Sequence, residues 1–460
     1  MSAVDTKTLD ISINAQNMMP IIKKWLYSDK DIFVRELIAN GVDAITKHKR
    51  LTATGEAEYD PAPYFVQVTI DFDNKSLRFS DNGLGMTADE AERYLGEVAF
   101  SGAAEFAKKY EQKGDDAIIG HFGLGFYSAF MMASRVVVES KSFLPDAAPV
   151  RWESDGVSEF TLSVGNRESR GTDVILYLDG ENEEFLSGEK LADIIKKHCS
   201  FLPVPIYLFD PAAGKEEAKK SDSDQDEKGP CACDHHHEDG ERACKQGGEC
   251  ACDHHHESGE CACEQGGECA CKQDSEKSVK EDSAPAERED YLGRQLNNTS
   301  PLWLKNPKDC TEDEYKAFYR SVFQTFDEPL FWLHLNVDYP FNLKGILFFP
   351  KLRADLGLEG QIKLYNNQVF VADNIKEIIP EFLMLLRGVI DCPDLPLNVS
   401  RSMLQNDGTV KKVQTHITKK TAERLNQLFE DHRETFEKDW NDIAPFVRYG
   451  AVRDQKFFDL

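Results

Sequence analysis

The feature that most constrains the fold is a segment in the middle of the chain, residues 211–290, from which the large apolar residues almost vanish. Lys, Asp, Glu, Gly, Cys and His take their place, so the segment cannot bury enough apolar surface to order itself. It carries 23 acidic and 10 basic side chains, a net charge of −13, which is about half of the −27 of the whole chain. We therefore predict a disordered, acidic, Cys/His-rich linker at 210–290 between two folded domains, 1–209 and 291–460.

A unit of 19 residues repeats inside this linker, as CACDHHHEDGERACKQGGE and then CACDHHHESGECACEQGGE. The Cys-x-Cys pairs and His triplets are suitable ligands for Zn²⁺, Ni²⁺ or Cu⁺. Zinc fingers prefer Cys-x₂-Cys with a small apolar core, which is absent, so a metal would organise a flexible loop. One hypothesis is a metal-binding or metal-sensing protein built on these repeats, and the alternative is a tolerated, solvated spacer. The candidate ligands are Cys231, Cys233, His235, Cys250, Cys252 and His254.

The charge and the apolar runs of the chain exclude several classes of protein. A formal charge of −27 repels phosphate backbones and anionic lipid surfaces, so neither nucleic acid nor a membrane is an expected partner. The amino terminus lacks the basic start and apolar core of a secretory signal, and no run of 18 apolar residues occurs. We expect a cytoplasmic protein whose cysteines stay reduced.

Hydrophobic periodicity in residues 1–209 predicts an α+β domain. Helical patterns occur at 21–26 and 31–49, and alternating strand patterns occur at 64–72, 76–81, 135–142 and 172–178.

Residues 291–460 show a second mixture of helical and strand patterns, which predicts an α/β domain. The expected elements are a helix at 313–324, strands within 331–350 and 361–373, and helices at 378–391 and 409–440.

The segment RELIANGVDA presents polar groups along one side of its predicted helix. At about 100° per residue, Glu36, Asn40, Asp43 and Lys47 line one narrow face. A carboxylate and an amide are thus presented one turn apart. Taken alone, the pattern is more typical of a solvated polar face.

Two further motifs place glycines beside strand ends. Asp81 directly follows a strand pattern and precedes Gly83 and Gly85, which allow a ligand to approach the backbone closely. An acidic acceptor there suits a base with an exocyclic amine, although a lone Asp-Asn-Gly is more often a tight turn. Gly171 and Thr172 begin another strand, where the hydroxyl could serve a ligand or cap an edge.

The segment IIGHFGLGFYSAFMMA sets Gly120, Gly123 and Gly125 just ahead of an apolar helical pattern. Glycine-rich backbone opening into a helix amino terminus offers N–H groups and a positive dipole end to phosphate oxygens. Tight packing would explain the glycines as well.

Together and in this order, the four motifs resemble the ATP-binding domain shared by gyrase, histidine kinases, MutL and the 90-kilodalton heat-shock chaperones. The best match is the bacterial HtpG type, through YSDKDIFVRELIANGVDAITK, SDNGLGMT, IGHFGLGFYS and RGT. PLWLKNP, KGILFFP, IKLYNNQVFVAD and DLPLNVSRSMLQND resemble the middle domain of the same chaperones. The resemblance implies a two-layer α/β sandwich that binds ATP, followed by an α/β middle domain.

The resemblance also implies a role for each motif. Glu36 would be the general base for the attacking water, and Asn40 would bind the Mg²⁺ that bridges the phosphates. Asp81 would accept the adenine amine, with Met86 packed on the base. The nucleotide-binding set it implies is Asn40, Asp43, Asp81, Gly85, Met86, Gly123, Gly125, Phe126 and Thr172.

In the second domain the resemblance assigns Arg401 to the γ-phosphate, with Gln405 nearby. A guanidinium suits phosphate oxygens because it is always charged and donates paired hydrogen bonds. Residues 87–120 would form a lid that closes over the nucleotide. Hydrolysis would then require the two domains to dock.

The lid departs from the family pattern. Tyr94, Phe100 and Ala103 stand where many relatives have Asn, Lys and Thr, so a ribose contact and a lysine-to-phosphate contact do not carry over. His121 replaces a usual Gln, which leaves the role of the backbone intact.

The function implied is that of an ATP-dependent molecular chaperone acting on client polypeptides. The chain stops at Leu460, inside the middle domain of the family, so we expect a weak or absent homodimer and weak ATPase activity. A histidine kinase would need a phosphoacceptor helix ahead of the nucleotide domain, and the roughly 30 residues before Glu36 leave no room for one.

Overall fold

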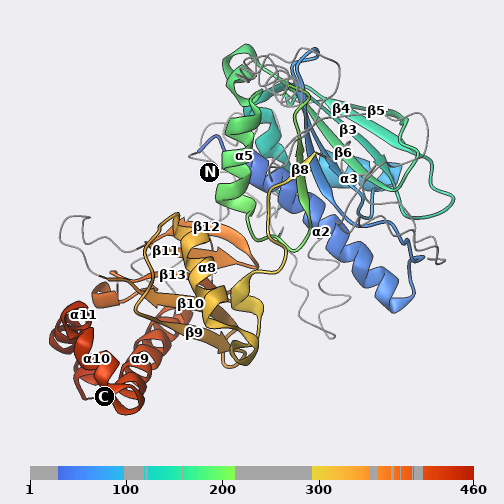
Figure 1. Ribbon diagram of the computed structural model, residues 1–460. Helices are drawn as coiled ribbons and strands as arrows, with labels where there is room; N and C mark the ends of the chain where they lie inside the picture. Colours follow the sequence, from blue (N-terminus) through green and yellow to red (C-terminus); the bar gives the residue numbers. More distant parts are fainter. Residues whose placement is uncertain are drawn as a thin grey trace, which may run out of the picture. The chain divides into compact units, whose positions relative to one another are not determined.

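The computed structural model describes residues 29–97, 119, 123–157, 159–212, 293–351, 361–374, 378–383, 385–395, 397 and 408–459 (Figure 1). The predicted helix at 21–26 and nearly all of the predicted linker lie outside these ranges. Within them, no helix combines the length and the apolar character that a membrane span requires.

The first domain is built on an eight-stranded sheet with the order β5-β4-β3-β6-β2-β1-β7-β8. Neighbouring strands are antiparallel except for β1 and β7, which are parallel. The four predicted strands are confirmed. The bounds are β1 Val66–Asp71, β2 Ser76–Asp81, β3 Ala133–Lys141, β4 Val150–Ser154, β5 Phe160–Val164, β6 Gly171–Leu178, β7 Ile206–Phe209 and β8 Arg294–Gln295.

Helix α2 (Ile32–Thr54) is the central helix of this domain and contacts α5 (Gly188–Cys199) and β2. Its apolar residues and the alternating buried residues of β1 belong to one core, which gives the expected two-layer sandwich of helices on a sheet. The helix ends at Gly55, whose φ of 77° places it in the left-handed region that favours glycine. The other helical segments are α3 Ala88–Gly96 and the 3₁₀ helices η2 Gly125–Met131 and η3 Gly180–Phe185.

The second domain is built on a five-stranded mixed sheet with the order β12-β11-β13-β10-β9. Helices cover both of its faces: side chains of β10 alternate between a cluster with α8 and a cluster with α9 and α11. The strands are β9 Phe331–Val337, β10 Leu343–Phe349, β11 Gln361–Asn366, β12 Val369–Asp373 and β13 Arg387–Asp391. The helical segments are α8 Glu312–Phe323, α9 Gly408–Asp431, α10 Arg433–Lys438, α11 Trp440–Arg453, α12 Gln455–Asp459, η4 Leu302–Leu304, η5 Pro307–Asp309 and η6 Glu381–Leu383.

One helix prediction in this domain is wrong, and a second is confirmed except for a break. Residues 378–391 form the short 3₁₀ helix η6 and then strand β13, not one helix. The run RGVID lies between β10 and β11 and is buried on both faces, so it lacks the period-two pattern that marks a half-buried strand. The predicted helix at 409–440 is interrupted at His432, whose backbone (φ −134°, ψ 50°) is not helical.

The two ends of the predicted linker are anchored side by side in the first sheet. Strand β7, which precedes the linker, pairs antiparallel with β8, which follows it, and Leu208 lies opposite Arg294. A long connection between adjacent strands is tolerated, because each doubling of loop length costs only about 0.6 kcal/mol of closure entropy. The β7–β8 pairing thus holds the two ends of the predicted linker next to each other.

An aromatic cluster joins residues from both sides of the linker. Phe201, which follows α5, has its ring centroid 4.6 Å from that of Trp303 and 5.5 Å from that of Tyr365. Val369 of β12 in turn belongs to the core of the first domain. Edge-to-face aromatic pairs of this kind add to the free energy of burial, so Phe201 connects the end of α5 to the sheet of the second domain.

We predict that Phe201→Ala lowers the free energy of unfolding by about 3–5 kcal/mol, because it leaves a cavity among packed rings. Urea unfolding followed by tryptophan fluorescence measures the change, since Trp303 lies in the cluster. The control is Phe326→Ala, which removes a fully exposed ring and is expected to change stability by less than about 0.5 kcal/mol. Equal effects of the two substitutions would contradict the assigned cluster.

Candidate functional site

Helix α2 lies directly against the turn that follows β2. A Cβ atom on Gly41 would come within 3.2 Å of the Cβ of Asp81. One turn further along, a Cβ on Gly83 would meet the Cβ of Ala44 at 2.6 Å, and the Leu84 N–H donates to the Ala44 carbonyl at 3.2 Å. The absence of side chains at Gly41 and Gly83 thus brings the first two sequence motifs into contact.

Asp81 ends β2 as a buried acid, with 7% of its surface exposed. Its Oδ1 accepts a hydrogen bond from the Gly83 N–H at 2.8 Å. Burial raises the pKa of this carboxyl to about 7, against the opposing effects of the Gly83 N–H and the nearby Arg167. A buried carboxylate with this pKa gains stability from any donor that a ligand brings to it.

A hydroxyl network connects Asp81 to the other strand motifs. Asp81 lies opposite Thr172 in the β2–β6 register, and the Thr172 and Ser140 hydroxyls are 2.9 Å apart. Ser140 also donates to the Gly171 carbonyl at 3.1 Å and accepts from the Met86 N–H at 2.9 Å. Ser140 is fully buried and therefore fixes Met86 and Thr172 relative to each other.

Position 85 favours glycine for two reasons, its backbone conformation and the closeness of its neighbours. Its φ of +63° is in the left-handed region, and a Cβ there would lie 1.8 Å from the Lys141 carbonyl oxygen. The turn after β2 is thereby held close to the end of β3.

Two arginines that the sequence analysis did not single out hold this turn in place. Arg167 donates to the Asp81 carbonyl at 2.7 Å and pairs with Asp173. Arg170 donates to the carbonyls of Asn82 and Gly83 and pairs with Asp60 at 2.7 Å. Their position just before Gly171 could have predicted this role. Strand β6 pairs with β2 beside Asp81, so the residues that precede β6 lie at the same turn.

Glu36 is buried on α2, with 3% of its surface exposed, and does not lie on a solvated face. Its Oε1 accepts from the adjacent Arg35 at 3.1 Å through Nε and at 2.8 Å through Nη2. Its Oε2 lies toward Gly125, where a Cβ would approach within 2.6 Å. The third motif therefore meets the first at this carboxylate, and Gly125 is needed because any side chain would displace it.

The other polar residues of α2 differ in exposure. Asn40, one turn after Glu36, is exposed. Asp43 is buried, and its Oδ1 accepts from the Ile119 N–H at 2.7 Å. Asp43 thus holds the backbone next to the glycine-rich segment.

The glycine-rich segment is only partly as predicted. Gly123 has a φ of +65°, as expected for a glycine-dependent turn. The following residues form the 3₁₀ helix η2 instead of the expected α-helix. The Phe126 ring is half-buried and packs into an aromatic cluster, 5.6 Å from Trp152 between centroids.

Several candidate residues lie outside the described part of the chain and stay predictions. They are Phe100, Ala103, Gly120, His121, Arg401, Gln405 and the linker set Cys231, Cys233, His235, Cys250, Cys252 and His254. Of the expected lid, residues 87–97 and 119 are described, and α3 begins there with a capping box between Thr87 and Glu90. Tyr94 lies half-buried on α3.

The chain is similar in sequence to known proteins along most of its length. Residues 28–159 match the family described as histidine kinase-, DNA gyrase B- and HSP90-like ATPase, and residues 184–458 match the family described as Hsp90 protein. The chain is 42% identical to the chaperone protein HtpG of Porphyromonas gingivalis over 98% of this chain and 56% of that protein. The corresponding values are 40%, 98% and 56% for HtpG of Bacteroides thetaiotaomicron, and 32%, 93% and 59% for HtpG of Idiomarina loihiensis. The chain therefore spans a little over half the length of these relatives.

We predict that Asp81→Asn changes how stability depends on pH. Because burial raises the pKa of Asp81 to about 7, the folded chain keeps a proton between about pH 4 and 7 that the unfolded chain has lost. Asp81 therefore makes the free energy of unfolding fall as pH rises through that window, by at most about 1.4 kcal/mol per pH unit. Asparagine keeps an acceptor for the Gly83 N–H and does not ionise.

The expected result is that the stability of Asp81→Asn relative to wild type increases from pH 4 to 7 and is level above pH 7. Urea unfolding at several pH values measures it. Asp73→Asn, which changes an exposed acid in the turn before β2, is the control. A stability difference that does not vary with pH would show that Asp81 is not a buried, protonated acid.

Proposed function

The chain belongs to the Hsp90 family, and from that premise we propose that its first domain binds ATP with Mg²⁺ and hydrolyses it to drive a protein-folding chaperone cycle. The observation that carries the proposal is the buried acid Asp81, which packs against Gly41 of helix α2. The same helix carries Glu36. An Hsp90-like ATPase domain is present at residues 28–159.

Adenine recognition is assigned to Asp81. The exocyclic amine of adenine would donate to its carboxylate, adding a donor beside the Gly83 N–H and offsetting the cost of burying the charge. Thr172, fixed by Ser140, offers a second polar group next to it. Met86 is partly buried against the same core and provides an apolar surface for the base.

The phosphates are assigned to the other end of the site. Mg²⁺, when bound, would neutralise charge as the phosphates separate. Asn40 offers an exposed amide oxygen one turn from Glu36, which suits a hard cation. The backbone at Gly125 lies beside the Glu36 carboxylate, so N–H groups of the segment from Gly123 to Gly125 would bind phosphate oxygens close to the base.

Glu36 is proposed as the general base. Arg35 holds Oε1 through two hydrogen bonds and so fixes the plane of the carboxylate. Oε2, on the side of Gly125, would then accept the proton of the attacking water. Arg35 acts through Glu36 and is a positioning residue.

The remaining proposals come from family membership. Arg401 and Gln405 would act on the γ-phosphate from the second domain, and residues 87–120 would close over the nucleotide. Client polypeptides and a cytoplasmic location are proposed as well, together with a homodimer that is weak or absent in this chain. The chain spans a little over half the length of its relatives.

We predict that nucleotide affinity depends on pH through Asp81. With the pKa at about 7, only about a tenth of the carboxyl is ionised at pH 6, so ADP affinity should rise about tenfold between pH 6 and 8. Calorimetry with Mg²⁺ measures it. Asp81→Asn should bind at least about tenfold more weakly at pH 8 and lose this dependence.

Titration of the phosphates is common to both proteins, so the difference between them isolates Asp81. An unchanged affinity in Asp81→Asn would remove the adenine assignment.

We also predict that Glu36→Gln lowers the ATP hydrolysis rate by about 10²- to 10⁴-fold and leaves ATP affinity nearly unchanged. The amide keeps the shape and an acceptor for Arg35 but cannot take a proton. A coupled phosphate-release assay and calorimetry measure the two quantities. Glu181→Gln, an exposed position on η3, should behave as wild type. Hydrolysis at the wild-type rate in Glu36→Gln would refute the assignment.

A further inference from the structure

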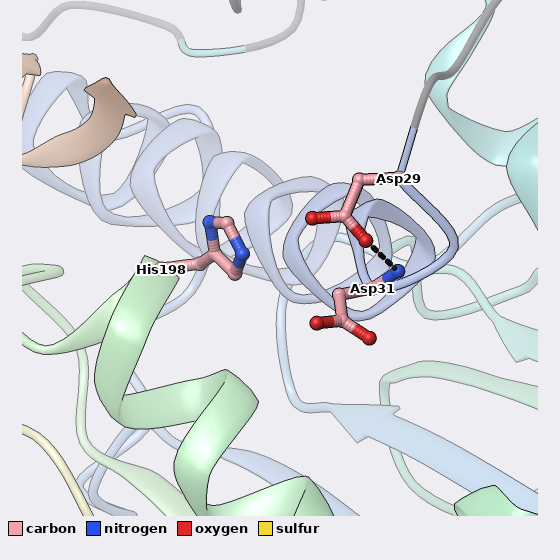
Figure 2. A group of neighbouring side chains, drawn as sticks. All are labelled: Asp29, Asp31 and His198. Atoms are coloured by element: carbon pink, nitrogen blue, oxygen red, sulfur yellow. Dashed lines mark hydrogen bonds between the residues drawn. The ribbon is translucent and has the colours of Figure 1, made fainter. Parts of the chain in front are cut away.

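Asp29, Asp31 and His198 form a cluster of ligand-type side chains outside the candidate nucleotide site. Asp29 and Asp31 precede α2, and His198 lies in the last turn of α5. One ligand atom from each residue lies within 4.8 Å of the other two. Figure 2 shows one imidazole nitrogen of His198 facing the two carboxylates.

His198 is the unusual member of this cluster. Only 5% of its surface is exposed, and neither ring nitrogen has a hydrogen-bond partner among the residues that the structure describes. Buried polar groups almost always have a partner, so these nitrogens indicate a water molecule or an ion bound at this place. The imidazole also meets the Phe370 ring at 5.7 Å between centroids, which fixes its position.

The geometry distinguishes an ion pair from a ligand. Neither ring nitrogen of His198 has a carboxylate of the cluster as a hydrogen-bond partner, so the imidazole is not held as one half of an ion pair. A neutral imidazole has a lone pair for a metal and no charge to offset two carboxylates. The ammonium of Lys197 lies 3.6 Å from Asp29 Oδ2, but its side chain is 52% exposed and such a pair is weak.

The two carboxylates are arranged to share a cation. Asp29 Oδ1 accepts from the Asp31 N–H at 3.0 Å, which sets the two side chains side by side. The Asp31 side chain caps no backbone group of α2, so helix capping does not explain it. Asp29 and Asp31 are like charges held next to each other, and a bound cation would relieve their repulsion.

We propose that Asp29, Asp31 and His198 bind a divalent transition-metal ion through one imidazole nitrogen and two carboxylate oxygens, with water completing the coordination. Bonds of about 2.0–2.2 Å require the three ligand atoms to draw closer than 4.8 Å, which rotation of the half-buried aspartates permits. The ion would fasten the segment before α2 to the end of α5. Imidazole with carboxylates suits Mn²⁺, Fe²⁺, Co²⁺ or Zn²⁺.

The probe is Mn²⁺, because manganese prefers carboxylate oxygen and competes poorly for the cysteine thiolates of the repeats. The linker histidines can also supply a ligating nitrogen, so the loss of ¹⁴N coupling in His198→Gln is what assigns the nitrogen to this site. The full chain is titrated with Mn²⁺ in the absence of nucleotide, and free Mn²⁺ is measured by electron paramagnetic resonance. Pulsed measurements on the bound ion detect ¹⁴N coupling from a ligating imidazole. The variants are Asp31→Asn and His198→Gln, with Asp73→Asn and His432→Gln as exposed controls.

The expected result is ¹⁴N coupling in wild type and in both controls, and its loss in His198→Gln. Affinity should fall at least about tenfold in Asp31→Asn and His198→Gln and stay within twofold in the controls. Two results would overturn the proposal. One is the absence of ¹⁴N coupling in wild type, and the other is an Mn²⁺ affinity of Asp31→Asn equal to that of the controls. In either case the ion would lie elsewhere or only water would fill the cluster. If His198→Gln does not fold, Asp31→Asn decides, because its side chain caps no backbone group.

Discussion

The close approach of helix α2 to the end of strand β2 is the constraint on which the candidate site depends. It is possible because Gly41 and Gly83 have no side chains at the points of contact with Asp81 and Ala44. The same helix brings Glu36 against Gly125, so three motifs that are far apart in the chain meet along one helix. A helix cannot shift along its axis without separating all of these contacts at once, which makes the relative positions of the two acids a property of the packing.

Burial of these acids gives the site its chemistry. Glu36 is held by Arg35, and Asp81 by backbone N–H groups, while burial opposes the ionisation of Asp81. Buried groups of this kind reduce the stability of the empty fold and are relieved by a ligand with complementary donors or charge. The same logic applies to the cluster of Asp29, Asp31 and His198 at the start of the same helix, where the complementary ligand would be a metal ion.

The second domain is connected to the first by shared side chains as well as by the chain itself. Phe201 packs among rings of the middle-domain sheet, and Val369 of that sheet packs in the first core. The end of α5 also carries His198, whose ring contacts Phe370. Helix α5 therefore contacts both helix α2, which carries Glu36, and strand β12 of the second sheet.

The sequence alone determined the elements with strong local signals and the chemistry of the motifs. Strand β2 at Ser76–Asp81 and helix α2 follow from alternation and helical periodicity, because one face of each element is apolar. The family followed from motifs whose glycines and acids stand at fixed spacings. The strand β13 was missed because a run buried on both faces has no alternation, and η2 was taken for an α-helix because both helices share an apolar pattern.

Only the tertiary structure decided which polar residues are buried and what they touch. Ser140, Arg167 and Arg170 become part of the site through strand pairing between segments 30 to 90 residues apart, which no local pattern records. Arg35 and His198 look like ordinary charged positions on helices, and their burial results from packing against other elements. Residue type and spacing are local properties of the chain, whereas burial and proximity depend on every element that surrounds a residue.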